Sequence, residues 1–451
     1  MALGRRGEEQ AEMWVAGTDL PRSPGHSFYE KLNQLLDQAE FDRQVEELCR
    51  PFYDEDMGRP GIPPGVYFRM LIVGYFEGLG AQRAIAWKCA DSLSIRNFLR
   101  LQLSESAPEH SSLTRIRKRL PLEVHVQAFT ILLEMARQKG LVRGKTIAVD
   151  ATTLEANAAM KSMVHRVSGE DWKAYLRRLA QAEGIEDPSD EDLRRFDRKR
   201  TDKKVSNAEW KSATDPAARI TKMKDGRTHF AYKAEHAVDV DSGVIVAAEI
   251  YSADDPDGDT LLATVEAARE QLAAVESAKE VEEVLGDKGY HKAESLAVLR
   301  EVHGVRTYIP EQKRKGRRRW VDKDAGQQAA VYANRRRCAG RRGRALGRLR
   351  SEYAERSFAH ICETGGARRS WLRGVTNVAK RYWITAGAHN LGVLMRALYN
   401  VGTPRSLQGA FAAICLVLLA LWVRLTRVWD GSPRPQWSQA PTGSLVPSAA
   451  A

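Results

Sequence analysis

Apolar residues recur at α-helical spacing over the first third of the chain. Two such stripes are Phe28, Leu32, Leu35 and Leu36, and then Tyr67, Leu71, Tyr75 and Leu79. Pro-Gly and Gly-rich breaks separate the stripes, so each helix is short. The pattern predicts an all-α domain over residues 26–140. A polar segment with Pro and Gly precedes it, and we expect residues 1–25 to form a flexible arm.

One helix of this domain is strongly basic. Ser111 or Ser112 can cap a helix that buries Leu113, Ile116 and Leu120. The basic residues that follow the cap are candidates to contact DNA in a major groove, as a recognition helix does. They are Arg115, Arg117, Lys118 and Arg119. The alternative is an ordinary solvated face, which these residues by themselves slightly favour.

The pattern changes to β-type after Lys145. A short apolar run over residues 146–149 ends at Asp150, and another over residues 282–286 ends at Asp287. Between them lie a hairpin (228–240 and 244–251, with Gly243 in the turn) and an amphipathic helix over residues 261–272. A further short strand is expected over residues 305–309. The order predicts a mixed α/β catalytic domain over residues 145–400 rather than a doubly wound nucleotide-binding fold.

Two segments stand apart from this core. Residues 161–225 are rich in charges of both signs and predict a charged helical insertion with little core of its own. Residues 401–451 predict an apolar helix followed by a Pro-containing disordered tail. The apolar run over residues 410–423 is shorter than the ~20 residues that span a bilayer, so no membrane partner is expected.

The net charge of +12 is concentrated in one part of the chain. Residues 301–350 contain 16 Lys or Arg against 4 Asp or Glu, which is also +12, so the remainder is close to neutral. A local excess of this size favours a polyanionic partner, because each neutralised phosphate releases counterions. The candidate DNA contacts here are Arg317, Arg318, Arg319, Arg335, Arg336 and Arg337.

The cysteines give no sign of a disulfide framework. The five of them lie far apart, and none has a Cys or His neighbour at zinc-ligand spacing. An odd, scattered set of thiols is typical of a reducing cytoplasm.

Asp150 and Asp287 are the strongest candidates for chemistry, since each ends an apolar strand. A carboxylate there is costly unless it is paired or binds a cation. Two such strands side by side would bring the carboxylates together, and oxygen ligands are what Mg²⁺ prefers. Two ions ~3.5–4 Å apart can activate an attacking hydroxyl and stabilise the leaving oxygen of a phosphodiester. The alternative is that both residues merely cap strands or form turns.

A two-ion site usually needs a third acid from a nearby helix. Glu355 is our choice, because Phe358 and Ile361 place an apolar stripe near its side of the helix. Glu352 and Glu363 lie on the same segment and remain alternatives. The basic segment falls between the second and third acids, where it could grip DNA beside the scissile phosphate.

At these residues the chain resembles the DDE transposases of bacterial insertion sequences. It is most similar to the insertion-sequence-five-like superfamily with a helical N-terminal domain. The similarity extends from about residue 26 to 405. It rests on residues 108–118, 148–157 around Asp150, 224–239, 286–291 around Asp287, and 355–360 from Glu355, followed by Arg373, Gly374 and Asn377.

The resemblance implies an RNase H-like core in which Asp150, Asp287 and Glu355 are catalytic and bind the metal. It implies two Mg²⁺ ions, with Mn²⁺ as a substitute, and places Arg356 and Tyr290 near the phosphate. In some relatives a Lys stands seven residues after the Glu; here that position is Cys362, so no such role is transferred.

The implied function is transposition. Such an enzyme binds the terminal inverted repeats of its element, cleaves the 3′ ends and joins them to target DNA by in-line phosphoryl transfer. The expected form is a homodimer on double-stranded DNA with paired ends, in the bacterial cytoplasm and associated with the nucleoid. The alternatives are an RNase H-like nuclease without strand transfer and a catalytically inactive DNA-binding relic.

Overall fold

The computed structural model describes residues 25–54, 58, 61–201, 206–277, 279–313, 320 and 324–406. Arg317, Arg318 and Arg319 lie outside the described residues, and so do the expected arm and the expected apolar helix with its tail. Within the described residues, no helix is both long and apolar enough to cross a membrane.

The N-terminal part is helical, as the apolar stripes predict. Its helices are α1 (Gly25–Gln38), α2 (Phe41–Cys49), α3 (Pro64–Phe76), α4 (Gln82–Asp91), α5 (Leu93–Phe98), α6 (His110–Arg119) and α7 (Leu122–Gln138), with a 3₁₀ turn at Arg50–Phe52. The predicted stripe residues Phe28, Leu32 and Leu36 are fully buried. The stripes therefore do face a core.

A mixed sheet forms the centre of the following part. Its strands in the described residues are β1 (Thr146–Glu155), β4 (Arg219–Lys222), β5 (Thr228–Asp239), β6 (Ile245–Ser252), β7 (Glu283–Leu285) and β8 (Arg306–Tyr308). The order is β4-β5-β1-β7-β8, and β6 also pairs with β5. Strand β5 runs antiparallel to both β1 and β6, whereas β7 and β8 run parallel to β1. The predicted mixed α/β class is confirmed.

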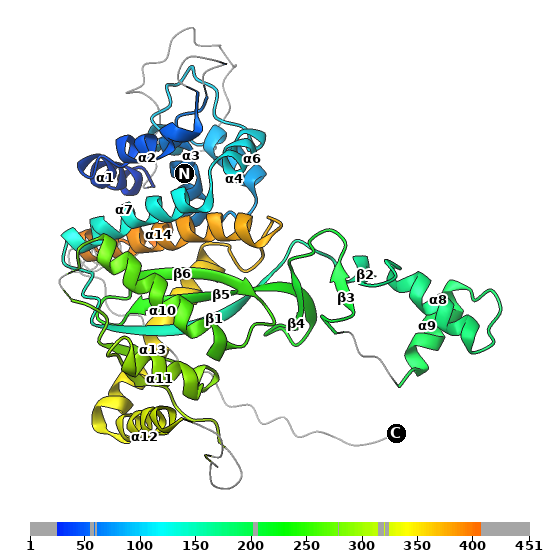
Figure 1. Ribbon diagram of the computed structural model, residues 1–451. Helices are drawn as coiled ribbons and strands as arrows, with labels where there is room; N and C mark the ends of the chain where they lie inside the picture. The colour runs from blue at the N-terminus through cyan, green and yellow to red at the C-terminus, as the bar shows by residue number, and fades with distance from the viewer. Residues whose placement is uncertain are drawn as a thin grey trace, which may run out of the picture. The chain divides into compact units, whose positions relative to one another are not determined.

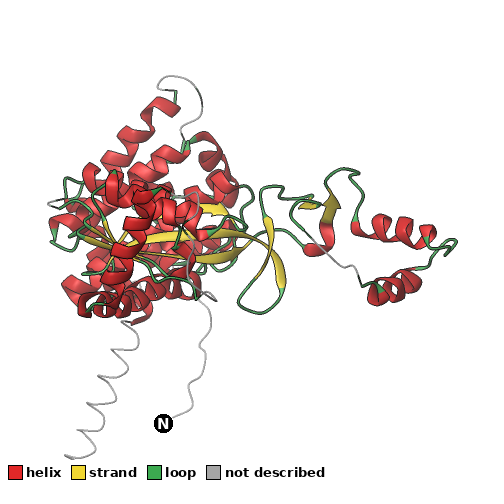
Figure 2. Ribbon diagram, turned by 60° about the horizontal axis from the view of Figure 1, so that its bottom comes forward, coloured by secondary structure: helices red, strands yellow, loops and turns green. Residues whose placement is uncertain are grey.

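Helices cover both faces of this sheet (Figures 1 and 2). They are α10 (Asp257–Ala274), α11 (Ala293–Glu301), α12 (Ala325–Ala339), α13 (Arg341–Ala359) and α14 (Val375–Tyr399). Successive side chains of β5 point to opposite faces of the sheet, so their contacts show which helices cover each face. His236 bonds to α13 and α14, whereas Lys233 and Glu235 bond to α10. Helix α7 of the N-terminal part lies along α14 (Figure 1), and α14 shares with α13 the contacts to His236.

The charged segment between β1 and β5 contains more structure than its composition predicts. Helices α8 (Trp172–Ala182) and α9 (Asp190–Lys199) are accompanied by a two-stranded sheet, β2 (Met163–His165) with β3 (Trp210–Ser212), and a 3₁₀ turn at Met160–Ser162. Leu176, Ala180 and Leu193 form a small core. Trp210 is buried against Trp172. The core is as small as the composition predicts, and aromatic residues far apart in sequence add to it.

Candidate active site

The pairing of β1 with β7 brings the two aspartates side by side. The last paired residues are Ala148 and Leu285. Asp150 and Asp287 each follow two residues later. Because β1 and β7 are parallel, both aspartates lie just beyond the same end of the paired region. Asp287 then begins a 3₁₀ turn (Lys288–Tyr290), and its Oδ1 accepts a hydrogen bond from the N–H of Gly289 at 2.7 Å. The sequence predicted this juxtaposition from the ends of two apolar runs.

Helix α13 carries Glu355 over the face of the sheet that Asp150 shares with its antiparallel partner His236. The buried imidazole of His236 fixes the helix to the sheet. Its Nδ1 lies 2.9 Å from Oγ of Ser357 and its Nε2 lies 2.8 Å from the hydroxyl of Tyr382. Its ring also stacks on Phe358, with centroids 3.9 Å apart. Glu355 is thus positioned by contacts two and three residues further along its own helix.

The electrostatics of Asp150 link the three acids. Burial raises the pKa of Asp150, and the charges of Asp287 and Glu355 raise it further. The guanidinium of Arg350 and the N–H of Ala151 oppose these effects and lower the pKa. Nη1 of Arg350 lies 3.0 Å from Oδ2 of Asp150. The charges of carboxylates from three distant segments therefore act on one another, and Asp150 already binds a cationic side chain.

The alternatives for the third acid are engaged elsewhere. Glu352 pairs with Arg356 at 3.0 Å on the exposed side of α13. Glu363, in the π-helical turn His360–Thr364 that ends α13, pairs with Arg368 at 2.6 Å. Glu355, in contrast, is among the groups whose charge raises the pKa of Asp150. Glu355 is also exposed, and it stays our choice for the third acid because its charge acts on Asp150.

Tyr290 occupies a different place from the one that the resemblance implied. Its side chain is fully buried beneath the turn after β7, and its hydroxyl donates to Oε2 of Glu235 at 3.1 Å. Nζ of Lys233 lies 3.4 Å from the same carboxylate and 3.0 Å from Asp257. A role beside the phosphate does not fit a buried phenol. Tyr290 instead supports the turn that presents Asp287.

The donor set suits a hard divalent cation, because all three candidate ligands are carboxylates and their mutual repulsion would be relieved by a metal. As the side chains stand, no group of three or more His, Cys, Asp or Glu among the described residues is spaced to hold an ion. Arg350 takes up one carboxylate oxygen of Asp150. The ligand chemistry of the three carboxylates fits a divalent cation, and Arg350 occupies one of the oxygens that such an ion would use.

The basic residues of α6 divide into two groups. Arg115, Lys118 and Arg119 are exposed, as the periodicity predicted. Arg117 is only 8% exposed, and its Nε donates to Oδ1 of Asn377 at 3.2 Å. The placement of Arg117 among the DNA-contacting residues is therefore corrected. It is four residues after Leu113, on the buried side of the helix, and joins α6 to α14.

The other basic candidates are also unequal. Arg336 is exposed on α12, and Arg335 is exposed but paired with Glu311 at 2.7 Å. Arg337 is partly buried and donates to the carbonyl of Thr307. Arg356 is exposed beside Glu355. Arg337 therefore supports β8 and is not free for DNA, whereas Arg335, Arg336 and Arg356 remain candidates.

Two further residues were missed from sequence. Arg350 is one of many arginines in a basic run, and nothing in the pattern distinguished it. His236 could have been found, because the hairpin pattern puts it on the strand next to Asp150. Its pKa is lowered well below the ordinary value by burial and by His389, so the ring is neutral and acts through hydrogen bonds.

Comparison with known protein families agrees with this geometry. Residues 19–119 match the family described as Transposase domain (DUF772), and residues 143–391 match the Transposase DDE domain. The second match covers more than half of the chain and includes all three acids. The chain belongs to the DDE transposases. Its mixed sheet, with β5 antiparallel to β1 and β6 and with β7 and β8 parallel to β1, is the RNase H-like core of this transposase. No curated protein and no solved structure matches it.

Proposed function

We propose that this transposase binds the terminal inverted repeats of its element, cleaves the DNA in a metal-dependent reaction and joins the freed 3′ ends to target DNA. The observation that supports this most directly is the placement of Asp150 and Asp287 beyond the paired ends of β1 and β7, next to the helix that carries Glu355. We further propose that these three residues are the metal ligands and that a homodimer holds the paired ends in the cytoplasm.

The chain's contribution is positioning and charge. Strand β1 fixes Asp150, the 3₁₀ turn fixes Asp287, and His236 fixes the helix of Glu355. Bound Mg²⁺, two ions by resemblance and replaceable by Mn²⁺, would lower the pKa of the attacking hydroxyl and stabilise the leaving oxygen. Preorganised groups of this kind act without reorganising during the reaction.

Substrate binding would begin at the helical domain, which we place at residues 26–140. The exposed Arg115, Lys118 and Arg119 of α6 would contact the repeat, and the phosphate backbone would supply much of the affinity. The catalytic domain would cover residues 145–400, with the insertion at about 161–225. Arg335, Arg336 and Arg356 would add phosphate contacts, and by charge alone Arg317, Arg318 and Arg319 would do the same.

The test is cleavage and strand transfer on a labelled duplex that carries the terminal repeat, with and without Mg²⁺. Asp150→Ala, Asp287→Ala and Glu355→Ala should each reduce both steps by more than about 100-fold, the upper range for losing a residue that only supports a metal ligand. DNA binding should be retained. Glu352→Ala removes a carboxylate from the same helix and should leave cleavage intact.

The other results have definite meanings. Cleavage without joined products would show a nuclease rather than a transposase. Binding without cleavage by the wild type would show an inactive relic. Full activity of Glu355→Ala would place the third acid elsewhere on the segment. Static light scattering on the protein with and without the duplex would test the dimer.

A further inference from the structure

Strand β1 has an open edge beyond the catalytic aspartate. Its pairing with β7 ends at Ala148, but the strand continues to Glu155. There a different segment takes up the edge: the N–H of Glu155 donates to the carbonyl of Arg368, and its carbonyl accepts from Ser370, at 3.0 and 2.8 Å. The backbone between Asp150 and Glu155 thus lies between the Asp287 turn and the loop that leads into α14.

This loop, residues 365–374, carries arginines along the open edge. Arg368 reaches back toward Asp150, with Nη1 3.5 Å from Oγ1 of Thr152. Arg369 lies 3.7 Å from the carboxylate of Glu155, and its guanidinium lies over the ring of Trp371, 4.9 Å from the centroid. Arg369, Trp371 and Arg373 are all exposed. The indole ring therefore holds a solvent-facing guanidinium in a defined position.

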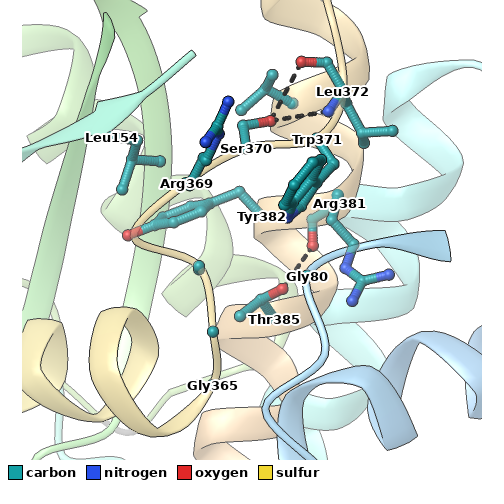
Figure 3. A pocket seen from close by; sticks show the side chains of 13 residues that line it. Gly80, Leu154, Gly365, Arg369, Ser370, Trp371, Leu372, Arg381, Tyr382 and Thr385 are labelled. Carbon is teal, nitrogen blue, oxygen red and sulfur yellow. Dashed lines mark hydrogen bonds between the residues drawn. The ribbon is translucent and has the colours of Figure 1, made fainter. Parts of the chain in front are cut away.

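The loop is held rigidly on its inner side (Figure 3). Gly366 has φ +69°, and a Cβ there would lie 2.5 Å from the carbonyl oxygen of Gly78. A Cβ on Gly80 would lie 3.0 Å from the Trp371 ring. The Nδ2 of Asn157 donates to the carbonyl of Trp371 at 3.1 Å. Two glycine contacts thus press the loop against the helical part.

The same loop connects the active site to α6. Arg373 directly precedes α14, whose first turns contact α6: Asn377 accepts from Arg117, and Nζ of Lys380 donates to the carbonyl of Arg117 at 3.1 Å. The loop therefore joins the end of β1 to the part of α14 that contacts α6, and it carries the exposed Arg369 and Arg373 between them. Nothing in the catalytic triad requires these exposed arginines.

We propose that the loop Arg368–Arg373 is a clamp for the DNA backbone, and that it holds the stretch of element DNA between the repeat bound by the helical domain and the scissile phosphate. Arginine suits this role because its planar guanidinium binds phosphate oxygens in pairs. Trp371 orients Arg369 and does not read bases. The inference rests on the proposed transposase function and specifies where the substrate strand approaches the acids.

The experiment compares Arg369→Ala/Arg373→Ala with Arg195→Ala/Arg300→Ala, which removes the same charge from exposed sites on α9 and α11. The probes are a fluorescent duplex that carries the terminal repeat and ends at the cleavage position, the same duplex with its flank, and a random duplex. Binding is measured by anisotropy over a range of salt concentrations. Thermal unfolding checks that each variant is folded.

We expect the clamp variant to bind all three duplexes about tenfold more weakly, and the slope of log K against log salt to fall by roughly 2, since each lost phosphate contact removes about 0.9. The control should bind as the wild type does. Trp371→Ala should weaken binding in the same direction, and Trp371→Phe should restore it because a ring again supports Arg369.

Three outcomes overturn the inference. Equal binding and cleavage by the clamp and control variants, with an active wild type, would remove the clamp and leave the proposed function standing. A defect confined to the flanked duplex would move the clamp to the other side of the cut. A wild type that binds no repeat DNA would overturn the proposed function and the clamp together.

Discussion

The guanidinium of Arg350 lies 3.0 Å from the carboxylate of Asp150, and both side chains are largely shielded from solvent, with 17% and 19% exposed. The arginine belongs to the same helix as Glu355. It therefore supplies positive charge to the acid cluster at the position where a metal would bind Asp150. We therefore expect a bound metal and Arg350 to compete for one carboxylate oxygen.

Arg350→Gln should tighten metal binding. The substitution removes a cation that occupies Asp150 and repels a divalent ion, so affinity for Ca²⁺ without DNA should rise several-fold in calorimetric titration. The metal-free variant should lose about 1–3 kcal/mol of stability, because Asp150 keeps its burial without its charged partner. Arg348→Gln, on the exposed side of α13, is the control. Unchanged Ca²⁺ affinity would mean that Arg350 does not compete.

His236→Phe should separate catalysis from binding. Phenylalanine preserves the stack on Phe358 but removes the ring nitrogen that bonds to the hydroxyl of Tyr382, whereas the hydroxyl of Ser357 keeps the carbonyl of Ala354. We expect a loss of about 1–3 kcal/mol in stability and a reduced cleavage rate, with unchanged DNA affinity. Stability comes from chemical denaturation and the rate from single-turnover cleavage. His229→Phe, on a less buried part of the same strand, should spare the rate. A normal rate in His236→Phe would show that the helix is held by other contacts.

Glu249→Gln should change how stability depends on pH. Burial, together with the charges of Glu235 and Glu270, raises the pKa of Glu249 to about 7. The folded protein therefore holds this proton more tightly than the unfolded chain, and stability falls as pH rises from about 4.5 to 7. The variant should gain about 1–3 kcal/mol at pH 8 and almost nothing at pH 4. Thermal unfolding across this range is the measurement, and equal shifts at both pH values would contradict the assignment.

Local patterns were enough to place the first two acids. Asp150 and Asp287 each follow an apolar run, and parallel pairing of such runs brings their ends together whatever the connections between them. Arg117 shows the limit of reading charge alone: its spacing of four from Leu113 already assigned it to the buried side of α6. Its position in the helical repeat was better evidence for burial than its charge was for contact with DNA.

Other features depend on contacts that no local pattern contains. Trp210 meets Trp172 only after β2 and β3 pair, so the composition of the insertion did not reveal this contact. Arg350 differs from its basic neighbours in that its side chain points from α13 toward Asp150. Strand β7 has three residues, too few for alternation to show, and is defined by its two neighbours in the sheet.

The insertion also bears on how the sheet assembles. Strands β1 and β5 form an antiparallel pair that extends to Glu155 and Ala231. They therefore have the topology of a hairpin in which residues 156–230 replace the turn. Closing so long a loop costs about 2 kcal/mol more chain entropy than closing a turn of about five residues. A folded insertion shortens the effective loop, because β2 and β3 pair near its two ends and Asn207 bonds to Ile220 where the chain returns to the sheet. The aromatic cluster around Trp210 thus favours the pairing of β1 with β5, although it belongs to neither strand.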